Sequence, residues 1–342
     1  MTFSSNLLQK NLRYYYSTRI IIFLLFILFG LIISIHGEPI QIQLNLAHGV
    51  PGNHPTNLAA LAIQQEIALQ TNNRIHLEIF SNMQFGEETE LVEMLQKSRL
   101  DLAVISTGPL SGYNPEINIL DLPYLFNSRL QAYQAWDGEP GTAILERFKN
   151  SGLYGICYWE NGLRSLTTKN TPVKTPSDLK NLYIRTMENS VYVDFFSCLG
   201  ALPTPMPWGQ VVPSLQAGII EAQENPIPII VTNKLENYQR YLILTRHVYN
   251  PHLVLYGPSL NEKLTRNDIA LISRIFYNFR IKQRQYVVEQ ETSGIKELQK
   301  KGMIVIEPDL VEFRKLGKEF SIITFNRFLK ETRVYFERYL KQ

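Results

Sequence analysis

A few side chains have the types and the positions needed to hold a small organic acid. Arg185 ends a predicted strand in an apolar setting, and Arg164 lies shortly after a glycine. A guanidinium presents a planar pair of N–H groups that matches a carboxylate. Asn225, before a proline, offers a donor and an acceptor, and Trp208 offers a flat apolar wall. Spacing alone favours the simpler interpretation of Arg185 as a solvated or ion-paired residue at a strand end.

Sequence motifs of enzymes and of cofactor binding are absent from the chain. It has no G-x-S-x-G, H-E-x-x-H, C-x-x-C, P-loop or G-x-G-x-x-G motif. The six histidines show no metal-ligand spacing, so we expect neither a metal nor a cofactor. His48 and His54 flank a loop at the expected ligand edge, where a surface or capping role is the simpler interpretation. A serine or cysteine nucleophile without a recognisable base remains an alternative.

The elements before residue 106 predict a sheet that could position such a site. They are, in chain order, a strand, a helix, a strand, a helix and a strand at residues 40–46, 55–67, 75–80, 87–98 and 102–105. This order predicts a mostly parallel sheet with helices on both faces. Ligands bind beyond the carboxyl ends of such strands, so the loops after residues 47, 80 and 105 should lie beside the site.

A second α/β unit is predicted from about residue 158 onward. A turn at residues 174–181 leads into the strand that carries Arg185, and Asn181 occupies a corner that often needs positive φ. Residues 202–208 read as a rigid extended loop. The remaining predictions are helices at 189–199, 210–217 and 267–300, strands at 219–225 and 301–306, and a last helix from Leu310 to the C-terminus.

The length and charge of the chain limit its class. The 342 residues suggest two lobes, and 45% hydrophobic with 19% charged residues is typical of a globular protein. The formal net charge is +3, but the first 37 residues hold three basic residues and no acid. The remaining body is neutral, with 31 basic and 31 acidic residues. Nucleic acid is therefore not an expected partner.

Residues 1–37 have the order of a targeting segment. Lys10, Arg13 and Arg19 precede an apolar run at residues 20–35, and Gly37 follows shortly after it. This order is typical of a secretory signal, with cleavage expected after Gly37. The run is also at the short edge of what spans a bilayer, so an uncleaved anchor remains an alternative.

The two cysteines, Cys157 and Cys198, lie in apolar stretches. Two buried free thiols are the favoured interpretation, and a disulfide stays open.

Six short motifs follow one another in an order that carries more information than any of them alone. They are residues 84–90 (Q-F-G-E-E-T-E), 160–164 (E-N-G-L-R), 176–185 (P-S-D-L-K-N-L-Y-I-R), 199–207 (L-G-A followed by P-M-P), 216–226 (Q-A-G-I-I-E-A-Q-E-N-P) and 239–247 (Q-R-Y-L with L-T and H). Together they resemble the solute-binding subunit of TRAP transporters, the tripartite ATP-independent periplasmic or DctP-like family. The resemblance covers roughly residues 40 to 330.

The resemblance implies roles for five residues. The arginine of the I-R motif, here Arg185, would hold the ligand carboxylate, and Asn225 would help to position the ligand. Arg164 and Glu88 would reach the cleft, and Trp208 would form a cleft wall. The chain would then be a binding protein rather than an enzyme, and it would need neither ATP nor a cofactor.

The resemblance also implies where and with what the protein works. It would bind a small organic acid, such as a C4-dicarboxylate, a 2-oxo acid or a sugar acid, and deliver it to TRAP permease subunits in the membrane. The location would be the periplasm, with membrane contact through the permease or an uncleaved N-terminal segment, and the chain would be a monomer. A membrane-anchored sensor and, less favoured, a secreted enzyme remain alternatives.

Several positions depart from the family pattern. Asn181 replaces the usual glycine, residues 221–222 are Glu-Ala rather than Asp-Gly, and Trp208 replaces the commoner Phe. Residues 210–212 are Gln-Val-Val where the family usually has Glu-Val-Tyr. The last two departures lie near the expected cleft, so the ligand need not be a plain C4-dicarboxylate.

The implied fold is a two-lobed α/β periplasmic-binding-protein fold (Venus-flytrap) with a hinge and a long C-terminal helix. The lobes are expected to close around the ligand. The expected parts are a leader at residues 1–37, lobe one at 38–161 plus 251–290, lobe two at 162–250 plus 291–320, and a C-terminal helix at 321–342.

Overall fold

The computed structural model describes residues 41–341, and the predicted leader at residues 1–37 lies outside them. From Gln43 onward the chain forms one compact unit. No helix among the described residues has both the length and the apolar character needed to cross a membrane.

The described residues form one mixed sheet of nine strands. The strand order is β2-β1-β3-β8-β4-β7-β5-β6, and β9 pairs with β8. The strands are β1 Ile42–His48, β2 Ile75–Phe80, β3 Leu102–Ser106, β4 Tyr154–Thr168, β5 Tyr183–Thr186, β6 Leu202–Pro205, β7 Ala222–Pro226, β8 Tyr241–Tyr256 and β9 Ile304–Ile306.

The sheet is parallel near both of its ends and antiparallel in its middle. β1 pairs with β3 in parallel, as the β-α-β-α-β order predicts, and β5 pairs in parallel with β6 and β7. β4 and β8, of 15 and 16 residues, run antiparallel from the Tyr154–Tyr256 pair to the Thr168–Tyr241 pair. These two long strands connect two parts of the sheet. One part is formed by β1, β2 and β3, and the other carries Arg185.

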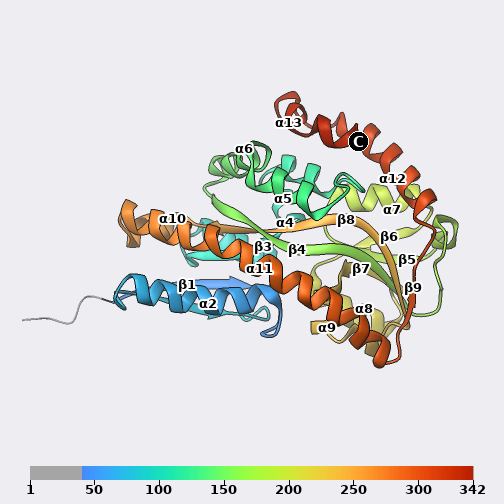
Figure 1. The fold of residues 1–342 in the computed structure, drawn as a ribbon, viewed down its shortest axis with the longest axis horizontal. Coiled ribbons are helices and arrows are strands. Elements are labelled where there is room, and N and C mark those ends of the chain that lie inside the picture. Colours follow the sequence, from blue (N-terminus) through green and yellow to red (C-terminus); the bar gives the residue numbers. More distant parts are fainter. Residues whose placement is uncertain (1–40, 342) are drawn as a thin grey trace, which may run out of the picture. The chain divides into compact units, whose positions relative to one another are not determined.

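Helices cover both faces of the sheet (Figure 1). The 35-residue helix α11 runs along one face beside α2 and α9, while α5, α6, α7, α12 and α13 lie on the other. The α-helices are α2 Pro55–Gln70, α3 Glu88–Gln96, α4 Thr107–Leu110, α5 Arg129–Asp137, α6 Glu139–Arg147, α7 Ser190–Cys198, α8 Val211–Ala217, α9 Ile227–Thr232, α10 Pro258–Lys263, α11 Arg266–Lys300, α12 Leu310–Phe325 and α13 Lys330–Leu340. Short 3-10 helices are η1 Pro115–Asp121, η2 Phe148–Ser151, η3 Pro176–Leu179, η4 Trp208–Gln210 and η5 Leu235–Asn237.

Side chains at the helix ends explain several boundaries. Thr265 and Asp268 form a capping box that begins α11, which confirms the long helix predicted from residue 267. His54 caps α2, since its Nδ1 accepts a hydrogen bond from the Thr56 backbone. The capping interpretation is thus confirmed for His54. The alternative of a surface position is wrong for both histidines, because His48 and His54 are buried.

Three local expectations differ from the structure. The single helix expected from Leu310 to the C-terminus is two helices: α12 ends at Phe325, and Leu329, whose N–H donates to the Glu116 carboxylate, precedes α13. Residues 202–205, expected as a loop, pair with β5 as the short strand β6. Both cysteines are free, but only Cys157 is buried; Cys198 is exposed, so the expectation of two buried thiols is wrong for it.

Candidate functional site

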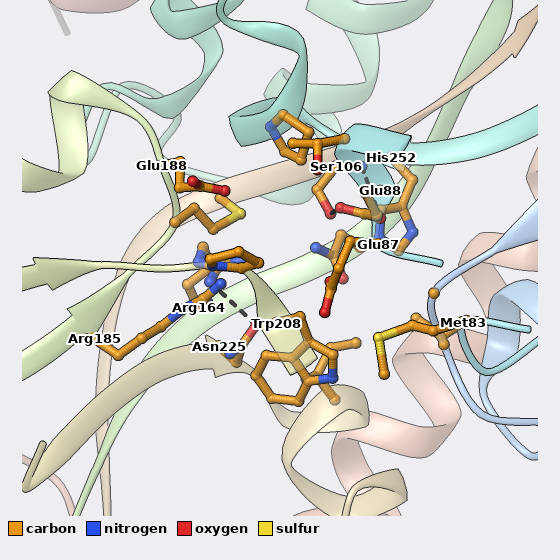
Figure 2. A pocket seen from close by; sticks show the side chains of 18 residues that line it. Met83, Glu87, Glu88, Ser106, Arg164, Arg185, Glu188, Trp208, Asn225 and His252 are labelled. Atoms are coloured by element: carbon orange, nitrogen blue, oxygen red, sulfur yellow. Dashed lines mark hydrogen bonds between the residues drawn. The ribbon is translucent and has the colours of Figure 1, made fainter. Parts of the chain in front are cut away.

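One pocket brings together all five side chains singled out from the sequence. Figure 2 shows the two arginines on one side of the pocket and Glu87, Glu88 and His252 on the other. The predicted residues that line it are Glu88 of α3, Arg164 of β4, Arg185 of β5, Trp208 of η4 and Asn225 of β7.

Strand pairing explains why three of these residues meet. β5 and β7 are parallel neighbours, with Arg185 in register with Gln223, so Arg185 and Asn225 lie at the same edge of the sheet. β4 runs antiparallel to β7, where Arg164 pairs with Pro226 and Ser165 with Asn225. Three strands thus bring Arg164, Arg185 and Asn225 to one edge of the sheet, where Arg164 donates to the Asn225 side chain across 61 residues of chain.

Arg185 is a buried cation without a charge partner. Its Nε and Nη2 both donate to the Met206 backbone oxygen, at 3.0 and 2.7 Å, and within the described residues no carboxylate lies within ion-pair distance of it. Burial lowers the pKa of Arg185 to about 10, although Glu224, Glu88 and Glu188 oppose that effect. Nη1 makes no hydrogen bond to the described residues, which leaves the Nη1–Nη2 end of the guanidinium able to take a carboxylate.

Arg164 is equally buried, but its charge is neutralised inside the protein. It forms a two-point ion pair with Glu224, and its Nη2 also donates to the Asn225 side chain at 3.1 Å. His247 contacts the same Glu224 carboxylate through Nε2 at 3.1 Å. Burial raises the pKa of Glu224, but the charge of Arg164 and the His247 contact outweigh it and leave the pKa below its ordinary value. Arg164 Nη1 has no hydrogen-bond partner among the described residues. Arg164 can therefore donate a hydrogen bond to a ligand while Glu224 balances its charge.

Asn225 and Trp208 shape the rest of this side. The Asn225 Nδ2 donates to Gln223 at 2.6 Å, and its oxygen accepts from Arg164, so the amide orientation is fixed. Trp208 is half-buried, and its ring lies 5.6 Å from the guanidinium carbon of Arg185. The ring therefore helps to hold the arginine in place and presents an apolar wall to the pocket.

Glu88 lies opposite the arginines (Figure 2). Its two oxygens accept from the Ser106 backbone N–H at 3.2 Å and from the Ser106 hydroxyl at 2.6 Å. Burial raises the pKa of Glu88, while the Ser106 hydrogen bonds act in the other direction. The carboxylate is thus oriented from behind, with further acceptor positions toward the pocket.

Sequence reasoning missed several residues that line the pocket, among them Asn161, Glu87 and His252. Asn161 was inside a quoted motif, so the signal was present without a role attached to it. His252 lies in β8, which the sequence did not predict as a strand; burial lowers its pKa to about 3, and it is neutral. Among the described residues there is no group of His, Cys, Asp and Glu suited to a metal ion.

Comparison with known proteins identifies the family of the chain. Residues 46–321 match the family model DctP, described as bacterial extracellular solute-binding protein, family 7. A solute-binding protein of Verminephrobacter eiseniae is 35% identical, covering 75% of this chain and 76% of its own. The 2,3-diketo-L-gulonate-binding periplasmic protein YiaO of Escherichia coli is 31% identical, covering 73% of this chain and 76% of its own.

A solved structure extends the match to the fold. The TRAP periplasmic solute-binding protein of Polaromonas, bound to D-erythronate, is 32% identical and superposes with a TM-score of 0.83, covering 86% of this chain and 98% of the other. The expected two-lobed binding-protein fold is thereby confirmed, and the relatives are binding proteins rather than enzymes. The chain belongs to the DctP family of bacterial extracellular solute-binding proteins, the solute-binding subunits of TRAP transporters.

Proposed function

We propose that the protein captures a small organic acid through one carboxylate and delivers it to the membrane permease of a TRAP transporter. Arg185 would take the carboxylate on its Nη1–Nη2 edge, Arg164 Nη1 would donate to it, and Asn225 and Trp208 would bound it. The observation that carries the proposal is Arg185 itself, a buried cation with no carboxylate partner among the described residues. A buried charge without a partner is costly, and a ligand carboxylate removes that cost.

The arginine side offers one cation that is not ion-paired to any described residue. Glu224 neutralises Arg164, so Arg185 is the cation left to attract an anion, and Glu188 also lines this side of the pocket (Figure 2). Opposite to it, Glu87 and Glu88 add negative charge (Figure 2). A second ligand carboxylate near these residues would be repelled, so this arrangement favours an acid with one carboxylate over a diacid.

Location and partners follow from the family. We expect residues 1–37 to direct export to the periplasm, either as a cleaved signal or as a retained anchor, and we expect the protein to be a monomer. A membrane-anchored sensor would use the same pocket but would need no permease.

A binding screen with matched arginine variants tests the proposal. We expect one or more organic acids to raise the melting temperature of the wild-type protein, because a ligand at about 100 times its Kd adds about 2.7 kcal/mol of stability. Arg185→Ala should lose this shift, and Arg185→Lys should lose most of it because an ammonium cannot form the two-point contact. Arg99→Ala, at an exposed position outside the pocket, is the control and should respond as the wild type does.

Two results of this screen would count against the carboxylate site. One is the absence of any shift with a broad panel of C4-dicarboxylates, 2-oxo acids, uronic acids and aldonic acids. The other is an equal shift in the wild type and in Arg185→Ala, which would place the ligand elsewhere.

A further inference from the structure

Two buried polar atoms that line the pocket have no hydrogen-bond partner among the described residues. One is Nη1 of Arg164, which the proposed carboxylate would occupy. The other is Oδ1 of Asn161, whose residue is 2% exposed and whose oxygen has no role in the carboxylate site. An unpaired buried acceptor is unfavourable, so a ligand that brings a donor to Asn161 gains affinity.

A chain of hydrogen bonds determines which atom of the Asn161 amide stays without a partner in the described part of the chain. Asn250 donates its Nδ2 to the Asp121 carboxylate at 2.7 Å and to the Thr107 hydroxyl at 2.9 Å. The Asn250 oxygen then faces Asn161 and accepts from the Asn161 Nδ2 at 2.8 Å. The Asn161 oxygen is therefore the end of this pocket-lining side chain that stays without a partner among the described residues, and it can only accept.

Asp121 fixes the direction of this chain because a carboxylate accepts hydrogen bonds and donates none. Besides Asn250, it accepts from the Asn189 amide at 2.8 Å and from the Tyr192 hydroxyl at 3.0 Å. Burial raises the pKa of Asp121 to about 6, and hydrogen bonds with Thr107, Asn250 and Tyr192 limit the rise, so the carboxylate form predominates above that pH. A flipped Asn250 amide would point its oxygen at this anion and is therefore excluded.

Glu88 supplies a second set of acceptors on the side of the pocket opposite to the arginines (Figure 2). The Glu88 oxygens accept two hydrogen bonds from Ser106, and a carboxylate can accept about four. A ligand carbonyl or a second carboxylate has no proton to donate to Asn161 or Glu88. A ligand hydroxyl donates to either of them and still accepts from other groups.

We propose that Asn161 and Glu88 make the site selective for hydroxy acids over oxo acids and unsubstituted acids of the same carbon skeleton. This inference rests on the proposed function, because it assumes that the carboxylate is held at Arg185. Asn161 is the specificity-determining residue, and Asn250 and Asp121 are positioning residues behind it.

The test compares two sets of four-carbon acids by titration calorimetry on the purified protein. Malate, oxaloacetate and succinate differ only at carbon 2, as do 2-hydroxybutyrate, 2-oxobutyrate and butyrate. We expect the hydroxylated member of at least one set to bind about 10-fold or more tightly than its oxo and unsubstituted members, the effect of one well-placed hydrogen bond. Equal affinities within both sets would overturn the inference.

Two variants assign the selectivity to Asn161. Asn161→Leu removes the acceptor at similar volume, and its preference for the hydroxylated acid should fall to about 2-fold or less by loss of that hydrogen bond. Asn161→Asp keeps an acceptor at the same place and should retain the preference, although it loses the hydrogen bond to the Asn250 oxygen and its added charge lowers all affinities. Thermal melting of both variants checks that they fold, and a Leu variant that keeps the full preference would overturn the role of Asn161.

The outcomes separate this inference from the proposed function. Acids that bind in an Arg185-dependent way without a hydroxyl preference would refute the inference alone. If no acid in either set binds and the broad panel also fails, the carboxylate site is wrong and the inference falls with it. If only larger acids of the broad panel bind, the same comparison is made with gluconate, 2-oxogluconate and 2-deoxygluconate, and the same outcomes decide.

Discussion

Arg164 and Glu224 form the most deeply buried ion pair at the pocket, with both side chains fully inaccessible. Glu224→Gln would keep the shape and most hydrogen bonds but leave the guanidinium charge uncompensated. We expect the free energy of unfolding to fall by about 3–5 kcal/mol, as is found when one partner of a buried pair is removed. Chemical denaturation at pH 7 measures this change. Glu93→Gln, at an exposed position, is the control, and a loss below about 1 kcal/mol in Glu224→Gln would show that Arg164 finds another counter-charge.

The same pair gives a pH dependence with a defined sign. The pKa of Glu224 is lowered in the folded protein, since Arg164 and His247 outweigh the effect of burial. A carboxyl with a lowered pKa stabilises the fold above its unfolded pKa of about 4.3 and loses this contribution as the pH falls through its folded pKa. The difference in stability between wild type and Glu224→Gln should therefore be full at pH 6 and shrink on acidification below pH 4.

At this scale the sequence analysis named five residues that the structure brings to one pocket, and it assigned the carboxylate to Arg185. It did not foresee that Glu224 neutralises Arg164 and leaves Arg185 without an ion-pair partner among the described residues. The acceptor role of Asn161 depends on Asn250 and Asp121, which lie far from it in the chain and meet it only through folding. No local pattern of residue types carries such an orientation.

At the scale of elements, a glycine in β4 controls how the strand presents Asn161 and Arg164. Gly162 has φ +136°, next to a register shift in the β4–β8 ladder, and an added Cβ would lie 2.7 Å from the Cβ of Pro226. Gly162→Ala should therefore destabilise the fold by about 2–3 kcal/mol or more through strain and overpacking. Gly218→Ala is the matched control, because Gly218 also has positive φ but has open space around its Cβ position. Its expected cost is about 1–2 kcal/mol, and equal losses in the two variants by denaturant unfolding would exclude the contact with Pro226.

The elements that the sequence predicted well are those with one buried face or a clear cap. β1 and β2 alternate, α11 begins at a capping box, and Asn181 has the positive φ expected of it, +62°. β8 was not predicted, because its residues are almost continuously buried and show no alternation. The break between α12 and α13 was also missed; the Leu329 N–H at this break donates to Glu116, about 200 residues earlier in the chain.

For the whole molecule, the pocket lies between groups from the two ends of the sheet. Glu87 and Glu88 come from the β1–β3 end, Arg185 and Trp208 from the β5–β7 end, and β4 and β8 connect the two. This arrangement accords with a hinge between two lobes, and the predicted lobe boundaries stay a prediction. If the lobes move, contacts that cross the pocket outside the ligand should control how long a ligand stays bound.

One such contact joins the two sides directly. The Gly209 backbone N–H, next to Trp208, donates to the Glu87 carboxylate at 2.8 Å across 122 residues of chain. Glu87→Gln weakens this charge-assisted hydrogen bond, and a loss of about 1 kcal/mol in the closed form corresponds to about 5-fold faster ligand dissociation. Stopped-flow displacement of a bound acid measures that rate, with Glu93→Gln, on the same side of the pocket but exposed, as the control.

The pattern across ligands tells a crossing contact from a ligand contact. Glu87 also lines the pocket, so a faster rate for one acid alone would mean that Glu87 touches that acid. A hydrogen bond that only holds the two sides together has the same energy whichever acid is enclosed, so the acceleration should be equal for every acid that binds. Unchanged dissociation for all of them would mean that the Glu87–Gly209 bond does not contribute to closure, and the closed form would then depend on the ligand itself bridging Arg185 and Glu88.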